Sequence, residues 1–260
     1  MSPEALEQAA RIFLACRDQG SKIDQLPDTC RPVTSEEGYQ IQDAFLKLDG
    51  AFAMGWKVAA TNKKTQTMLG ISQPFAGILP NTALSLSPLN IPASIFTNPA
   101  LEGEFAVLLG NNLPETGVSY DAETVMAAVA AVIPAVEIVD SRIGDRKAAG
   151  EQTLIAAGTV AGLVLGTPCT DWRSLNLPAH KVSLYIDEEL KGEGDGSMVL
   201  GDPFNSLAWL ANLCIDLGCP LTGGQIITLG TCTGLAPIAP GSRSVVDFGA
   251  MGEIWLNFDF

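Results

Sequence analysis

The sequence predicts an α+β protein, with a small, mainly helical N-terminal element over residues 1–50 and a β-rich body over residues 51–260. Two observations support this division. Up to residue 50, apolar side chains recur every three or four residues, which is the spacing of helices with one buried face. From residue 51 onward, short apolar runs are separated by Gly and Pro, which is typical of β-strands joined by turns.

Four segments have the pattern of helices. Two fill the first element, at residues 3–17 and 34–48, and the second of them ends before Asp49-Gly50. A third helix is predicted over residues 118–133, which are rich in Ala and Val and precede Pro134. The fourth covers residues 201–218, with Asp202 as its N-cap and Gly218 at its C-terminal end.

The strands of the body are predicted from short apolar runs that are rich in β-branched residues. They cover residues 53–61, 75–80, 103–110, 135–143, 156–166, 180–190, 225–232 and 253–260.

Charge and composition exclude several classes of partner. The chain carries 29 acidic and 15 basic residues, so its net charge of −14 repels nucleic acids and anionic membrane surfaces. We find neither a signal-peptide pattern nor a long apolar run, so we expect a cytoplasmic protein without a membrane partner. Because the chain has one histidine, His180, a zinc site built on a His cluster is excluded.

Two glutamates stand two positions apart in a predicted strand. Glu102 and Glu104 therefore point to the same face, together with Ala106 and Leu108. Carboxylates that lean into an apolar wall repel each other unless a cation or protons intervene. Glu137, in another apolar strand, offers a third oxygen ligand, and three carboxylates favour Mg or Mn over Zn.

The alternative for these glutamates is an ordinary structural role. Glu102 and Glu104 would then lie on an edge that faces solvent, and Glu137 would pair with Arg142 or another base. Lys57 is a further candidate, because its apolar neighbours suggest a cleft in which desolvation would lower the pKa of its amine. The alternative for Lys57 is a lysine on the surface.

Four segments, in this order along the chain, carry a resemblance to a known family. They are residues 55–79 (beginning GWKVAAT), 101–110 (LEGEFAVLLG), 133–143 (IPAVEIVDSRI) and 201–242 (beginning GDPFNSLAWL). Their combination is similar to the 2-keto-4-pentenoate hydratase and 4-oxalocrotonate decarboxylase family, which shares the C-terminal fold of fumarylacetoacetate hydrolase. The similarity runs from about residue 35 to the C-terminus.

The resemblance implies a fold, a cofactor and a chemistry. The expected fold is a mixed β-roll, and the expected assembly is a homo-oligomer. Glu102, Glu104 and Glu137 match the family's ligands for a divalent cation, Mg or Mn, and Lys57 matches a lysine that would relay or steer a proton. The substrate would be a small 2-oxo acid or 2-hydroxydienoic acid that reacts through a metal-stabilised enolate, with its carboxylate held near Thr231.

Two departures from the family pattern separate the possible reactions. Phe75 follows Gln73-Pro74 where hydratases of the family usually carry an acid, and Ala156-Ala157-Gly158 stands where relatives show Ala-Asp-Asn. Fewer polar groups predict a drier, roomier pocket, in which a water molecule is hard to position. A hydratase-like lyase is therefore one hypothesis. A decarboxylase or tautomerase that acts on a 2-oxo acid or a bulkier apolar substrate is the second, and a catalytically altered binding or partner subunit is the third.

Overall fold

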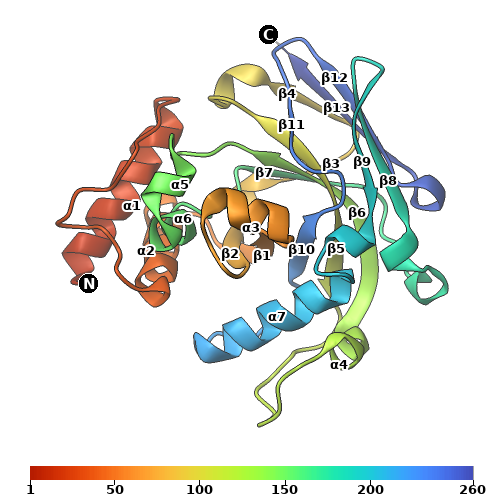
Figure 1. The fold of residues 1–260 in the computed structure, drawn as a ribbon, viewed down its shortest axis with the longest axis horizontal. Helices are drawn as coiled ribbons and strands as arrows, with labels where there is room; N and C mark the ends of the chain where they lie inside the picture. Colours follow the sequence, from red (N-terminus) through yellow and green to blue (C-terminus); the bar gives the residue numbers. More distant parts are fainter. Residues whose placement is uncertain (260) are drawn as a thin grey trace.

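The computed structural model describes residues 1–259 and arranges the chain as two mixed sheets flanked by helices (Figure 1). The helices are α1 (Pro3–Asp18), α2 (Ser35–Asp49), α3 (Lys63–Leu69), α4 (Ala122–Val125), α5 (Arg146–Ala149), α6 (Glu151–Ala156) and α7 (Pro203–Asp216). The strands are β1 (Ala53–Ala59), β2 (Phe75–Pro80), β3 (Leu84–Leu86), β4 (Leu89–Pro92), β5 (Ala100–Leu109), β6 (Val129–Val139), β7 (Gly162–Leu165), β8 (Lys181–Ile186), β9 (Glu189–Asp195), β10 (Ile226–Thr231), β11 (Ala236–Pro237), β12 (Arg243–Asp247) and β13 (Glu253–Asp259).

The larger sheet has the strand order β2-β1-β10-β5-β6-β7-β3, and β11 pairs with β5 outside this path. It is mixed, because β1 runs parallel to β10 whereas β10, β5, β6 and β7 pair antiparallel with one another. The smaller sheet has the order β4-β13-β12-β8-β9 and contacts the larger one through β5 with β8 and β6 with β13. The α+β fold with a mixed β-roll that the sequence predicts is confirmed.

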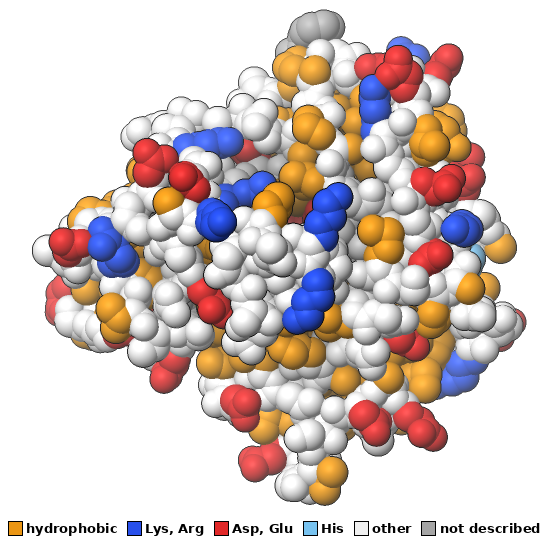
Figure 2. Space-filling view, in the orientation of Figure 1, with side chains coloured by type: hydrophobic (Ala, Val, Ile, Leu, Met, Phe, Trp, Pro, Cys, Tyr) orange, Lys and Arg blue, Asp and Glu red, His pale blue; other side chains and the backbone are white. Residues whose placement is uncertain are grey.

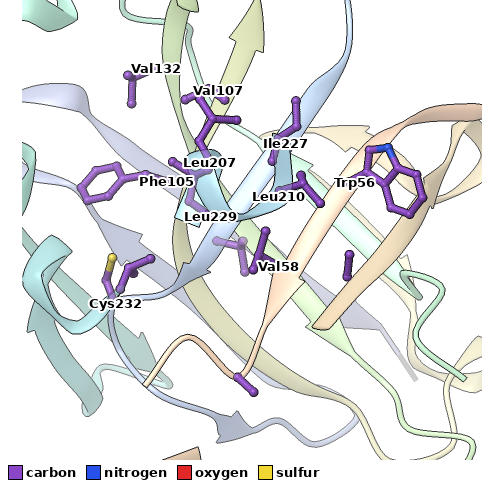
Figure 3. Close-up of a cluster of buried hydrophobic side chains, with 14 of the residues drawn as sticks. Trp56, Val58, Phe105, Val107, Val132, Leu207, Leu210, Ile227, Leu229 and Cys232 are labelled. Atoms are coloured by element: carbon purple, nitrogen blue, oxygen red, sulfur yellow. The ribbon is translucent and has the colours of Figure 1, made fainter. Parts of the chain in front are cut away.

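The largest hydrophobic core fills the space between the larger sheet, the smaller sheet and α7. Figure 3 shows Leu207 and Leu210 of this helix near Val107 and Leu229 of the sheet, and all four side chains are fully buried. The helix begins as predicted, because the Asp202 side chain accepts a hydrogen bond from the backbone N–H of Phe204 at 2.8 Å. Because successive side chains of β5 point to opposite faces of the sheet, the face away from this core carries Glu102, Glu104, Ala106 and Leu108.

The first two helices form as predicted and lie side by side, at the end of the molecule away from β8 and β9 (Figure 1). α2 begins with a capping box between Thr34 and Glu37, and the chain leaves it at Gly50, whose φ is +67°. The division of the chain at residue 50 stays a prediction. No helix within residues 1–259 combines the length and apolar character needed to cross a membrane.

A buried glutamine joins α2 to the larger sheet. The Gln42 side chain is 0% exposed, donates hydrogen bonds to the carbonyls of Ala76 (3.0 Å) and Ile155 (2.7 Å), and accepts one from the N–H of Ile78 (2.7 Å). The Tyr39 hydroxyl accepts a further bond from the N–H of Ala76. Since buried polar groups need partners, these bonds hold α2 in a single position over β2 and α6.

The predicted helix over residues 118–133 is wrong in its second half. Only Ala122–Val125 form α-helix, and β6 begins at Val129 and runs through Pro134, where the sequence predicts a turn. Strand β6 is buried on both faces between β5 and β7, so it lacks the alternation that identifies a strand with one exposed face. A short apolar run of this kind fits either structure, and tertiary pairing decides.

The predicted strand over residues 156–166 is also only partly correct. Residues 151–156 form α6, and the strand is confined to Gly162–Leu165 in β7. Helix α6 packs on α2 where Gly38 allows close approach, because a Cβ atom there would lie 2.9 Å from Ile155. The final predicted strand, 253–260, forms as β13 over Glu253–Asp259, and Phe260 lies outside the described residues.

We expect Gln42→Ala to lower the free energy of unfolding by about 2 to 3 kcal/mol, because it leaves two carbonyls and one N–H without their buried partner. Chemical denaturation followed by circular dichroism measures the loss. Gln40→Ala is the matched control, since Gln40 lies on the same helix and bonds only to the side chain of Glu36 at its exposed surface. Equal stability of both variants would contradict the role given to Gln42.

Candidate functional site

Three carboxylates meet on the face of the larger sheet opposite α7. Glu102 of β5 lies directly across from Glu137 of β6, and Glu104 lies two residues further along β5. One carboxylate oxygen from each of the three lies within 4.8 Å of the others. The strand register, which the sequence does not specify, therefore brings the three predicted ligands together.

These carboxylates are removed from solvent. Glu104 is 1% and Glu137 3% exposed, whereas Glu102 is partly accessible. Burial, together with the neighbouring charge of Glu137, raises the pKa of Glu102 to about 7 and the pKa of Glu104 well above its ordinary value. The alternative of a solvent-facing edge is therefore wrong for this pair.

The cluster suits a hard divalent cation. Two oxygens bound at about 2.1 to 2.4 Å on opposite sides of one ion lie about 4.2 to 4.8 Å apart, so the observed spacing fits one ion. The donors are carboxylate oxygens without His or Cys among them, which is the set that Mg²⁺, Mn²⁺ and Ca²⁺ prefer. Glu102, Glu104 and Glu137 are the residues that would hold the ion.

Lys57 lies on the same face. It is opposite Thr228 of β10 in the register, and Thr228 is opposite Ala106 of β5, so all three share the face of the glutamates. The Nζ atom of Lys57 is 3.3 Å from an oxygen of Glu137 and 5.7 Å from the centre of the Phe75 ring. Lys57 is therefore a largely buried lysine, and the alternative of a surface lysine is wrong.

The second alternative, that Glu137 pairs with Arg142 or another base, holds only for the other base, because Glu137 pairs with Lys57 and not with Arg142. Its guanidinium lies over the Phe45 ring and donates hydrogen bonds to the carbonyls of Ala157 (3.4 Å) and Thr159 (3.2 Å). Burial lowers its pKa to about 10. Arg142 therefore fixes the loop after α6 instead of neutralising the glutamates.

A small cavity of about 80 Å³ opens beside Lys57 and Glu137. Its wall combines apolar residues, among them Phe75, Leu154 and Ala157, with the polar or charged residues Lys57, Glu137, Asp140, Ser141, Arg146 and Thr159. Position 75 brings no acid to this wall, but Asp140, Ser141 and Thr159 line it as well, so the drier pocket stays a prediction. The expected extra room is not found next to Lys57, because the ring of Phe75 is buried in the wall and occupies the space.

The backbone comes very close to Lys57 on one side. A Cβ atom on Gly77 would lie 1.9 Å from the carbonyl oxygen of Gly158 and 2.8 Å from Cε of Lys57. Position 77 therefore accepts only glycine in this packing. The Lys57 side chain is therefore confined by strand β2 on one side and by the loop at Gly158, which Arg142 holds in place, on the other.

Thr231 lies at the other end of the cluster. It is opposite Glu104 in the register, and its hydroxyl oxygen accepts a hydrogen bond from the N–H of Gly234 at 2.9 Å. Its neighbour Gly230 donates its N–H to Glu104 at 3.2 Å. Thr231 is not part of the wall of the cavity beside Lys57, so only its place next to Glu104 relates it to the site.

Sequence reasoning missed Arg146, which lines this cavity from the start of α5. A single arginine in a loop segment is usually a surface residue, so composition and spacing gave no reason to select it. The sequence offers one local signal. Asp145 is the N-cap residue of α5, so this helix begins at Arg146, beyond the strand that carries Glu137.

Comparisons with known proteins identify the family of the chain. Residues 55–256 match the family model described as fumarylacetoacetate (FAA) hydrolase C-terminal. The chain is 32% identical over 256 residues to 2-hydroxyhexa-2,4-dienoate hydratase of Comamonas testosteroni, covering 96% of each chain. It is 29% identical to 2-keto-4-pentenoate hydratase of Paraburkholderia xenovorans (strain LB400), covering 100% of this chain and 97% of that one.

Solved structures share the fold. The 4-oxalocrotonate decarboxylase from Pseudomonas putida G7, complexed with magnesium and adipate, superposes with a TM-score of 0.91 at 24% identity, covering 99% of this chain and 98% of that one. Fumarylpyruvate hydrolase from Pseudomonas aeruginosa, in complex with Mn²⁺ and pyruvate, gives a TM-score of 0.60 at 15% identity, covering 79% and 88%. The chain therefore belongs to the FAA hydrolase C-terminal family, as an enzyme related over its full length to 2-keto-4-pentenoate-type hydratases.

Proposed function

We propose that the chain is a metal-dependent lyase that acts on a small 2-oxo or 2-hydroxydienoic acid. The observation that carries the proposal is the buried cluster of Glu102, Glu104 and Glu137 with the Lys57 amine 3.3 Å from Glu137. The names of the relatives support a hydratase reaction, and the structural neighbour named 4-oxalocrotonate decarboxylase suggests decarboxylation as the alternative. A homo-oligomer is part of the same proposal.

The three glutamates would hold Mg or Mn, and such an ion would supply a Lewis acid for the 2-oxo group and the carboxylate beside it. Lys57 is confined by Gly77 and Gly158, so its Nζ stays at the cavity, where it transfers or steers a proton at a carbon of the substrate. The Thr231 hydroxyl, whose oxygen accepts from Gly234, keeps its hydrogen available for a substrate carboxylate.

The composition of the cavity favours a second candidate, which is decarboxylation or ketonisation on the same residues. Phe75, Ala157 and Gly158 offer no side-chain group that holds a water molecule, and addition of water requires one. Phe75, which cannot hold a water molecule, therefore favours decarboxylation or ketonisation over hydration.

We expect the monoacid 2-hydroxypenta-2,4-dienoate to be hydrated slowly, and ketonisation of dienols or CO₂ release from 2-oxo diacids to be faster. Steady-state assays in Mg²⁺ or Mn²⁺ score the three reactions separately, and metal-dependent binding of oxalate checks that the site is formed. Efficient hydration would show that another residue replaces the missing acids. Absence of all three reactions together with absence of oxalate binding would overturn the proposed function.

Glu102→Ala should weaken Mg²⁺ binding by about 100-fold or more, because it removes one of three ligands. The affinity of the unmodified protein should rise about tenfold or more between pH 6 and 8. Below its pKa of about 7 Glu102 is protonated, so the cation must displace a proton there. Titration calorimetry measures both effects. Glu115→Ala on an exposed loop is the control, and an unchanged affinity in Glu102→Ala would refute the metal site.

Lys57→Met should reduce turnover by about 100-fold or more while it binds Mg²⁺ at least as tightly, because the lysine moves a proton and its positive charge repels the ion. Kinetics and calorimetry on the same preparation separate the two effects. Lys64→Met, at an exposed position of α3, should match the unmodified protein in both. Near-normal turnover in Lys57→Met would remove the role assigned to Lys57.

A further inference from the structure

Two cysteines meet where helix α7 ends. The chain leaves the helix through Gly218, whose φ is +71°. The N–H of Gly218 donates to the carbonyl of Ile215 (2.9 Å), and the N–H of Cys219 donates to the carbonyl of Cys214 (2.8 Å). These two bonds form a Schellman motif, in which the residues that share the outer bond, here Cys214 and Cys219, pack their side chains together. The turn itself therefore places the two thiols side by side.

The two thiols differ in access and in acidity. Cys214 is 0% exposed, whereas Cys219 is exposed. A hydrogen bond between the two side chains lowers the pKa of Cys219, against the opposing effects of burial and of the charge of Asp43. The same hydrogen bond, together with burial, raises the pKa of Cys214. Cys219 therefore has the larger fraction of thiolate, which is the form of a thiol that reacts.

Cys219 is also the cysteine that solvent reaches best. All six cysteines lie within the described residues and are free thiols. Four of them are buried and one is half-buried, which leaves Cys219 as the single exposed thiol. In the view of Figure 2, hydrophobic side chains, the class that includes cysteine, reach the surface in the region where Figure 1 places α7. A small reagent in solution therefore meets Cys219 first.

The pair does not form a metal site. Two thiolates need two further ligands to hold Zn²⁺ in its tetrahedral geometry. Within residues 1–259 the only group of three or more His, Cys, Asp or Glu ligands is the glutamate cluster. The chemistry left to two adjacent thiols is oxidation to a disulfide, which requires the close approach that the turn provides.

We propose that Cys214 and Cys219 form a reversible disulfide when the protein meets hydrogen peroxide or an organic hydroperoxide. Cys219 is the thiol that the peroxide oxidises, and Cys214 is the thiol that resolves the product. This redox site goes beyond the proposed lyase reaction and uses none of its residues.

The reaction takes two steps. The Cys219 thiolate attacks one oxygen of hydrogen peroxide, the O–O bond breaks, and the departing hydroxide takes a proton to become water, which leaves the sulfur as a sulfenic acid. The sulfur of Cys214 then attacks that of Cys219, the S–O bond breaks, and the thiol proton of Cys214 leaves with the hydroxide as a second water. The peroxide is thus reduced by two electrons while two thiols become one disulfide.

The pair lies close to the helix that holds strand β2. Cys214 shares a hydrophobic core with Tyr39 of α2. Burial raises the pKa of Tyr39 to about 12, and the two thiols add to this shift. In Figure 1 the C-terminal end of α7 points toward the side of the molecule that carries α2. Because the disulfide closes a loop of only a few residues, it adds little stability and acts as a reversible modification of the end of α7.

The experiment treats the full, reduced chain with a small molar excess of hydrogen peroxide and then blocks the remaining thiols with N-ethylmaleimide. Mass spectrometry should show a loss of two hydrogens and two fewer maleimide adducts than in the reduced protein. Cleavage after Leu217 separates the two cysteines, so a pair of peptides joined by a reducible bond identifies the bridge. Dithiothreitol should restore the starting mass.

Three variants assign the roles. Cys219→Ser should form no disulfide, and its remaining thiols should react about tenfold or more slowly than Cys219 does, because they are shielded. Cys214→Ala should stop at the sulfenic acid, which dimedone traps, because the resolving thiol is missing. Cys169→Ser, at the half-buried cysteine outside the pair, is the matched control and should behave like the unmodified protein.

Three results would overturn the inference. One is oxidation of Cys219 to the sulfinic acid while Cys214 stays free. Another is a Cys219→Ser variant that still loses two hydrogens at the rate of the unmodified protein. The third is a bridge between two chains in place of one within a chain. The melting temperature of each variant checks the fold, and Cys219→Ser, at an exposed position, decides the matter even if Cys214→Ala is unstable. No turnover is measured, so the result is independent of the lyase reaction.

Discussion

Repulsion among three buried carboxylates is the constraint on which the rest of this structure depends. Glu102 and Glu137 face each other across two paired strands, where like charges destabilise a sheet, and Glu104 lies beside them at almost full burial. The strands cannot separate to relieve this, because β5 and β6 lie in the middle of the larger sheet and are paired on both sides. The relief must therefore come from protons or from positive charge. The raised pKa values of Glu102 and Glu104 favour protonation, and Lys57 and the Gly230 N–H lie beside the cluster.

The helical N-terminal residues are connected to this chemistry through the backbone. Gln42 and Tyr39 of α2 hold β2 at Ala76, the residue between Phe75 and Gly77. Gln42 also holds the end of α6, from which the loop at Gly158 begins. Both segments press on Lys57, so the position of its amine depends on helix α2, which holds them in place.

The family and the reaction are separate questions here. Full-length similarity to hydratases and a shared fold with a decarboxylase identify one scaffold that serves more than one reaction. The choice among reactions lies in the few side chains around the cavity. Phe75 and Ala157 bring no polar group to this cavity, whereas Ser141 and Thr159 beside them do.

The sequence by itself determined the features that depend on local spacing. It predicted α1, α2 and α7 from helical periodicity and from caps such as Asp202, and it placed Glu102 and Glu104 on one face because strand side chains alternate. Only the tertiary structure decided the rest. The pairing of β5 with β6 set Glu137 opposite Glu102, burial on both faces made residues 129–133 a strand, and a short helix turned Arg146 toward the cavity. These outcomes depend on contacts between residues far apart in the chain, which local patterns do not encode.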